Sequence, residues 1–175
     1  MSIEKIISTL PNRTAAERAA MRCRAIDKLD AGDAKYAVDA GRLLTALNEL
    51  EASEGAERIA AAQARPEAER VIYAFEILPM SALEERLIQV LLDNPGSSNR
   101  DLSRGLGWKD NGWDMWFGML CRDRMHYLWP AKLAPARNAP FYCGILADLQ
   151  EPENLFTMKP FVAASFSEMG LRRRS

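Results

Sequence analysis

The stretch from Ser81 to Ala147 constrains the fold more than any other part of the chain, because signals that start and stop helices follow one another closely in it. It opens with ALEERLIQVLLDN, whose apolar residues recur at helical spacing. This segment stops at Asn94-Pro95-Gly96, a combination that breaks helices. Either Ser98 or Asn99 can then accept hydrogen bonds from the free N–H groups at the start of a second helix. The stretch therefore begins as two helices joined by a tight turn.

A third helix and two extended pieces are predicted after the second helix, which is short and ends at Gly105–Gly107. The third helix covers residues 111–125, and the extended pieces cover residues 126–129 and 139–147. The segment between the extended pieces is rich in proline, which lacks a backbone N–H and clashes with the preceding helical turn. We therefore expect an irregular connection between two short strands.

Three helices followed by a two-stranded hairpin with an irregular tip resemble the winged helix-turn-helix superfamily. The resemblance covers residues 81–147 and lies in the pattern of elements, without signature residues. It implies a small β-hairpin whose tip is the wing. It also implies that the third helix enters the major groove of DNA.

The regions on either side of this module are predicted to be helical. In residues 1–80, Thr14 and Glu17 have the spacing of a capping box, and Gly32 is suited to end that helix. Asp33 is predicted to cap the next helix, and a separate Ala-rich helix follows from Ser53. Residues 148–175 are predicted as a polar link, a short helix and a frayed Arg-rich tail. The predicted fold class is mainly α.

Composition narrows the class of protein. The 175 residues are 48% apolar and 27% charged, which is typical of a folded globular chain. No apolar run approaches the ~20 residues that span a bilayer, so we expect no membrane association. Three widely spaced cysteines, Cys23, Cys121 and Cys143, argue against a disulfide framework and for the cytoplasm.

The distribution of charged residues is compatible with nucleic-acid binding but does not require it. The net charge of −1 excludes a strongly basic binder of the histone type. Residues 97–140 nevertheless hold seven Lys and Arg against four Asp. Arg100 and Arg104 lie four apart on the second helix, and Lys132 and Arg137 lie in the wing tip, where phosphate contacts are expected. Asn111 and Arg122 on the third helix are suited to base edges. The predicted DNA-binding residues are Arg100, Arg104, Asn111, Arg122, Lys132 and Arg137.

The third helix also carries features that disfavour DNA. Helical spacing assigns one side to the core: Trp113, Trp116, Phe117, Leu120 and Cys121. The opposite side carries Asn111, Asp114, Met115, Gly118, Arg122 and Met125. A carboxylate at Asp114 would be repelled by phosphate, and exposed methionines are typical of a protein-binding surface.

Catalytic and metal chemistry is not expected. Cys121, His126 and Cys143 are the conceivable metal ligands, but a Cys and a His five apart on a helix do not share a face. The sequence has no Gly-rich phosphate loop and no GxSxG elbow. We therefore predict no enzyme activity, no metal and no cofactor.

Two functions remain. The first is a DNA-binding transcriptional regulator, a homodimer whose N-terminal helices supply dimerisation so that two half-sites are read. The second is a protein–protein interaction scaffold built on the same module. Salt dependence distinguishes them, because binding to phosphates weakens steeply with salt and an apolar contact does not.

Overall fold

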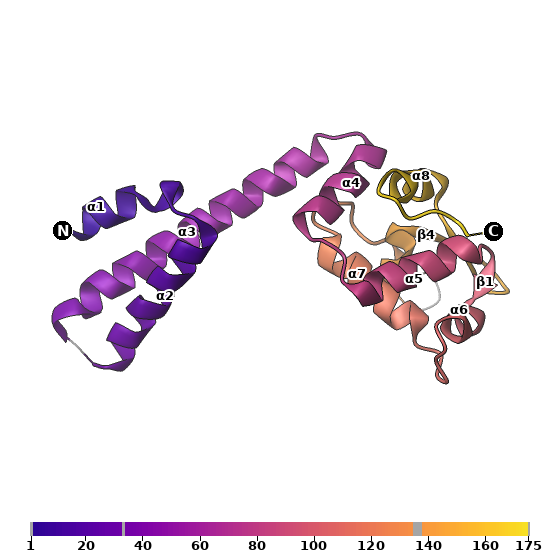
Figure 1. The fold of residues 1–175 in the computed structure, drawn as a ribbon, viewed down its shortest axis with the longest axis horizontal. Helices are drawn as coiled ribbons and strands as arrows, with labels where there is room; N and C mark the ends of the chain where they lie inside the picture. The colour runs from indigo at the N-terminus through magenta and orange to yellow at the C-terminus, as the bar shows by residue number, and fades with distance from the viewer. Residues whose placement is uncertain (1, 33, 135–137, 175) are drawn as a thin grey trace. The chain divides into compact units, whose positions relative to one another are not determined.

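A computed structural model describes residues 2–32, 34–134 and 138–174 (Figure 1). It is mainly helical, with 65% helix and 8% strand, so the prediction of a mainly helical protein is confirmed. The chain divides into two compact units, Met1–Arg58 and Ile59–Ser175, which we call the N-terminal and C-terminal units.

The N-terminal unit is built from helices. Its elements are α1 (Ile3–Ser8), the short 3-10 helix η1 (Leu10–Asn12), α2 (Ala15–Asp30) and most of α3 (Ala34–Gln63). The predicted capping box is present, because Thr14 Oγ1 accepts from the Glu17 N–H while the Glu17 carboxylate accepts from the Thr14 N–H. Gly32 takes a φ of +66° directly after α2, as expected of a residue that ends a helix. The predicted cap at Asp33 lies outside the described residues.

Helix α3 is longer than the sequence indicates. The prediction of a separate Ala-rich helix from Ser53 is wrong, because α3 runs unbroken from Ala34 to Gln63 through Gly55. An internal glycine costs a helix about 1 kcal/mol relative to alanine. The many alanines after Gly55 have the highest helix propensity and offset that cost.

The C-terminal unit contains the helices of the central module. Ser81 caps α5 through a capping box with Glu84, and Ser98 rather than Asn99 caps the next helix by accepting from the Asp101 N–H. The helices are α4 (Glu67–Ile77), α5 (Ala82–Asp93), α6 (Asn99–Gly105), α7 (Trp113–Arg124) and α8 (Pro160–Glu168). Three predicted helices of the module therefore form close to their expected positions.

The strands lie elsewhere than predicted. Residues 126–129, predicted as extended, form a turn after α7. A two-stranded sheet pairs β2 (Leu133–Ala134) with β3 (Ala139–Pro140), and the 3-10 helix η2 (Tyr142–Ile145) follows. The larger sheet is antiparallel with the order β1-β5-β4, formed by β1 (Ser97–Ser98), β4 (Ala147–Gln150) and β5 (Leu155–Met158). The predicted polar link after Ala147 is therefore wrong, since it contains the hairpin β4–β5.

The C-terminal segment packs onto the unit and is not frayed as predicted. Phe166 on α8 meets Phe75 on α4 edge to face, with ring centroids 5.1 Å apart. Gln89 Nε2 donates to the Arg172 carbonyl at 2.8 Å, and the Arg174 N–H donates to Asp93 Oδ1 at 2.7 Å. These backbone contacts fix the last described residues against α5.

Candidate interaction surface on helix α7

The inward face of α7 anchors the helix in the core of the C-terminal unit. Trp113 and Phe117 are fully buried and stacked, with ring centroids 4.6 Å apart. Trp113 also meets Phe156 of β5 edge to face and donates from Nε1 to the Leu87 carbonyl of α5 at 3.1 Å. One side chain thus ties α7 to both α5 and the sheet.

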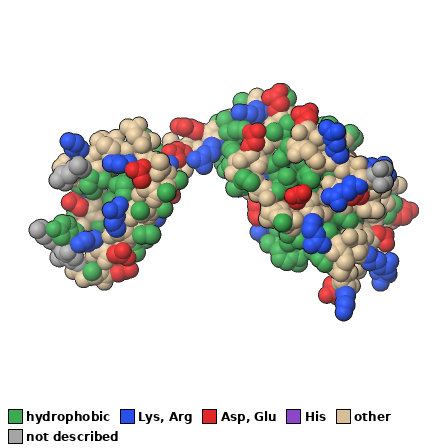
Figure 2. All heavy atoms as spheres, in the orientation of Figure 1, with side chains coloured by type: hydrophobic (Ala, Val, Ile, Leu, Met, Phe, Trp, Pro, Cys, Tyr) green, Lys and Arg blue, Asp and Glu red, His purple; other side chains and the backbone are tan. Residues whose placement is uncertain are grey.

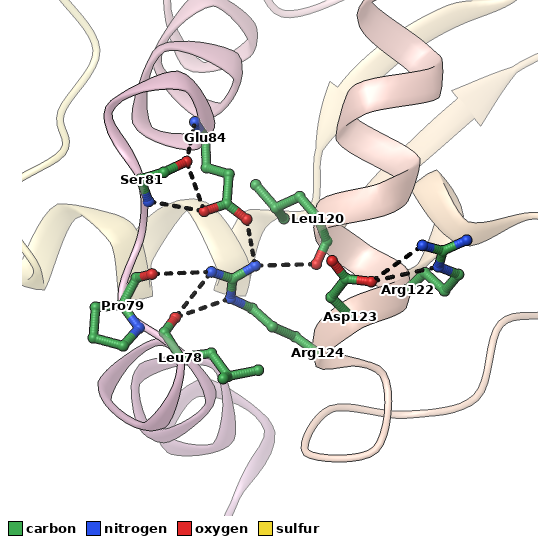
Figure 3. Close-up of polar contacts among 8 residues, drawn as sticks. All are labelled: Leu78, Pro79, Ser81, Glu84, Leu120, Arg122, Asp123 and Arg124. Carbon is green, nitrogen blue, oxygen red and sulfur yellow. Dashed lines mark hydrogen bonds and ion pairs between the residues drawn. The ribbon is translucent and has the colours of Figure 1, made fainter. Parts of the chain in front are cut away.

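Arg124 completes this inward face at the C-terminal end of α7 (Figure 3). Its guanidinium is 3% exposed and forms an ion pair with Glu84 at 2.7 Å. It also donates to backbone carbonyls of Leu78 and Leu120, at 2.9 Å and 3.2 Å, and lies over the Phe75 ring. Because its donors are engaged, this arginine joins α7 to the α4–α5 connection and is not a ligand-binding group.

The Glu84 carboxylate is the partner of Arg124 in this ion pair. Burial opposes its ionisation, but hydrogen bonds from Arg124 and from the Ser81 backbone outweigh burial and keep the pKa of Glu84 below its ordinary value. One carboxylate therefore serves the capping box of α5 and the arginine of α7 (Figure 3).

The outward face of α7 is apolar. Met115, Trp116 and Met119 are 56%, 41% and 38% exposed. The prediction that Trp116 lies in the core is therefore wrong. The prediction that Gly118 faces outward is also wrong, because it is buried against η2, where an added Cβ would lie 3.5 Å from Cys143 Sγ. Figure 2 shows hydrophobic side chains gathered on the lower surface of the C-terminal unit, the region of α7 in Figure 1.

A depression of about 220 Å³, which we call the α7 groove, runs between this face and the segment after β3. Ligand pockets typically hold about 300–1,000 Å³, so the groove fits a protruding side chain better than a small molecule. Its lining residues are Asp114, Met115, Gly118, Met119, Arg122, Pro140, Phe141, Tyr142 and Cys143.

Hydrogen bonds hold the wall opposite α7 in place. Cys143 Sγ donates to the Asp114 carbonyl at 3.1 Å, and Trp129 Nε1 donates to the Ile145 carbonyl at 2.9 Å. Lys159 Nζ donates to the Gly144 carbonyl at 2.6 Å. Burial, reinforced by the charge of Asp114, raises the pKa of Cys143 to about 12, so this thiol is a neutral packing group. The groove is therefore a preformed feature.

A second, polar depression of about 230 Å³ lies beside α6 and the loop that leads to α7. It brings together three of the predicted DNA-binding residues, Arg100, Arg104 and Asn111, with Lys109. Arg104 lies 3.6 Å from Asp101, both side chains being exposed, and Asp110 also lines the depression. In Figure 2, Lys/Arg and Asp/Glu side chains lie together at this loop, so its positive charge is partly compensated.

The other predicted DNA-binding residues do not join this cluster. Arg122 is exposed in the α7 groove, 3.4 Å from Asp123. Lys132 is exposed directly before β2 and lines neither depression. Arg137 lies outside the described residues. Of the six predicted DNA-binding residues, Arg100, Arg104 and Asn111 line one depression.

Asp114 has a structural role that the sequence did not indicate. Its Oδ1 accepts from Asn99 Nδ2 and from the Met115 N–H, both at 2.9 Å. The Asp114 N–H in turn donates to Asn99 Oδ1 at 3.0 Å. This reciprocal pair joins the start of α6 to the start of α7 and gives the carboxylate hydrogen-bond donors from within the protein.

The β4–β5 hairpin presents an acidic tip. Asp148, Glu151 and Glu153 are exposed on β4 and in the connection to β5. A tip of this charge is repelled by phosphate rather than attracted to it.

Among the residues that the structure describes, no helix is long and apolar enough to cross a membrane, and no group of three His, Cys, Asp or Glu is placed to hold a metal ion. Comparison with known proteins finds no matching family model, curated protein or solved structure.

Sequence reasoning missed most of the groove. Met119 was assigned to neither face, although Met115, Met119 and Arg122 have the i, i+4, i+7 spacing of a single helical stripe. Phe141 and Tyr142 gave no signal, because their place opposite α7 depends on the irregular segment that contains β3 and η2.

Proposed function

We propose that residues 81–158 form a winged helix-turn-helix that docks a protein partner through the outward face of α7. The element order α5-β1-α6-α7-β4-β5, with β2, β3 and η2 inserted between α7 and β4, supports this, as does the sheet order β1-β5-β4. In this arrangement the wing is the β4–β5 connection, not the proline-rich segment around β2 and β3. The fold alone leaves open whether α7 meets nucleic acid or protein.

The observation that carries the proposal is the exposure of Met115, Trp116 and Met119 on the face of α7 that a DNA reader would use for polar contacts. Exposed Trp is enriched among residues that dominate protein–protein affinity, and Met adapts its shape to a partner. The α7 groove beside these residues offers a preformed place for an apolar anchor.

The charge around the groove indicates the chemistry of the partner. The Asp114 carboxylate already accepts hydrogen bonds from within the protein, so Arg122 is the cation in the groove that a bound segment meets. Arg122 forms an ion pair with the exposed Asp123, a pairing worth little in water. The segment that fits is therefore amphipathic, with apolar side chains for the groove and a carboxylate beside them for Arg122.

DNA binding is the second candidate, and one specific observation favours it. Arg100, Arg104 and Lys109 line a polar depression together with Asn111, and such a cluster suits a phosphate. The acidic β4–β5 tip and the apolar face of α7 oppose this function. DNA therefore ranks below a protein partner here.

Two matched variants of the full chain test the proposal. Met119→Glu places a carboxylate on the apolar face, and Arg104→Ala removes a cation from the polar depression. We expect the wild type and Arg104→Ala to retain the same protein from nuclease-treated extract. Once purified, that protein should bind Met119→Glu at least about tenfold more weakly than it binds the wild type. This binding should change little with salt.

The opposite pattern would make the chain a DNA binder. The wild type would then be retained on random duplex DNA at low salt and released as salt rises. Arg104→Ala would weaken that retention, and Met119→Glu would not select any protein. This result would overturn the docking proposal.

A further inference from the structure

We propose that a second copy of this chain packs against the outer face of α3 in the N-terminal unit. A groove of about 520 Å³ lies along this face, beside α1. Its lining residues are Ile7, Ala37, Val38, Gly41, Arg42, Thr45, Ala46 and Glu49. All of them lie within the N-terminal unit, so the proposal is independent of the function assigned to α7.

The N-terminal unit buries little apolar surface of its own. Its buried apolar side chains among the described residues are Ile3, Leu10, Ala25, Ala40 and Leu47, and of these only Leu10 and Leu47 are fully buried. Ile26, Leu29, Tyr36 and Val38 stay exposed. A unit of this size with so small a core is commonly stabilised by oligomerisation.

The outer face of α3 is shaped for another helix. Val38 is 70% exposed, and a Cβ added at Gly41 would meet nothing within 4 Å. Thr45 and Ala46 follow one turn later and are also small. Small side chains let two helix backbones approach closely, while Val38 supplies an apolar contact at the end of the groove.

The charges on this face are self-complementary. Arg42 and Glu49 lie seven residues apart and therefore on one side of α3. An antiparallel two-fold crossing between Thr45 and Ala46 places Arg42 opposite the partner subunit's Glu49, and the symmetry creates the same pair again. Arg42 already contacts Glu4 at 2.9 Å, but a guanidinium has five N–H donors and can serve both carboxylates. This match of opposite charges selects a second copy as the occupant.

Charge reversal in the full chain tests this surface, with mass measured by light scattering after size exclusion. We expect the wild type to be a dimer and Glu49→Arg to be a monomer, because each Arg42 then faces a cation. Asp27→Arg on the exposed surface of α2 is the matched control and should remain dimeric. Circular dichroism checks that each variant keeps its helix content.

Exchanging the two charges, by Arg42→Glu together with Glu49→Arg, gives the decisive comparison. These variants are made in a Glu4→Gln background, because Glu4 would repel a carboxylate at position 42. In that background Glu49→Arg should be monomeric, whereas Arg42→Glu with Glu49→Arg should be dimeric again. A monomeric wild type at every concentration measured would overturn the proposal. So would a dimer that Glu49→Arg leaves intact.

Discussion

The two units of this chain hold their helices together by different means. In the N-terminal unit, α2 and α3 are tied by ion pairs such as Arg18–Glu54, at 2.6 Å, and Arg22–Glu51, at 2.9 Å, around a small core. In the C-terminal unit a continuous apolar core surrounds Trp113 and Phe117, and its buried arginine is paired. The contrast teaches that the C-terminal unit is stabilised mainly by its own buried core, whereas the N-terminal unit buries little apolar surface and relies more on ion pairs between its helices.

The largest expected effect lies in the C-terminal unit. Arg124→Ala should lower the free energy of unfolding by about 3–5 kcal/mol, because it leaves the Glu84 carboxylate and several backbone carbonyls without their donor. Arg122→Ala, two residues away and exposed, should change it by about 0.5 kcal/mol or less. Urea unfolding followed by tryptophan fluorescence measures both. Equal effects would show that Arg124 does not brace α7.

A smaller effect tests the carboxylate side of the same contact. Because the pKa of Glu84 is lowered in the folded chain, its contribution is present above the unfolded pKa of about 4.3 and is lost as pH falls through the folded pKa. Glu84→Gln should cost about 1.5 kcal/mol at neutral pH, since a charged hydrogen bond is replaced by a neutral one.

Unfolding free energies of both proteins at neutral and acid pH check this point. The difference between them should shrink toward acid pH. A difference that stays constant would mean that the charge of Glu84 is not what stabilises the contact.

The N-terminal unit should respond more weakly to the same kind of change. Arg18→Ala removes a two-point contact with Glu54, but both side chains are partly exposed to water, so we expect a smaller loss of unfolding free energy than for Arg124→Ala. Hydrogen exchange of the α2 and α3 amides reports this locally. A loss as large as that of Arg124→Ala would erase the distinction between the two units.

The mildest test is chemical labelling of the cysteines, which needs no substitution. Cys23 in the N-terminal unit is exposed, whereas Cys121 and Cys143 are buried and burial raises their pKa values. A thiol reagent should label Cys23 promptly in the native protein and the other two only after unfolding. Prompt labelling of Cys143 would mean that η2 opens readily and that the α7 groove is not preformed.

Local signals in the sequence predicted much of the fold. The caps at Thr14 and Ser98 and the extent of α7 follow from residues close together in the chain. The hairpin β4–β5 was missed because strands of four residues carry almost no alternation of apolar and polar residues. The unbroken α3 was missed because Gly55 looks like a break.

The candidate site was predicted only in part, and Arg124 shows why. It lies seven residues after Phe117 and four after Leu120, on the stripe that sequence spacing assigns to the core. Its charge nevertheless suggests the surface. The half-buried partner that allows Arg124 to be buried, Glu84, is 40 residues away and gives no local signal. Arg100, Arg104 and Asn111 were brought together as expected, since α6 and the following loop are adjacent in sequence.

The most direct test of the docking surface is photo-crosslinking from α7 in the source cells. A photoreactive amino acid replaces Met119 in one variant and Arg100 in another. The account predicts a nuclease-resistant protein adduct from position 119 that disappears when Met115→Glu is added, and no such adduct from position 100. Nuclease-sensitive adducts at both positions would contradict it and identify the surface as one that meets DNA.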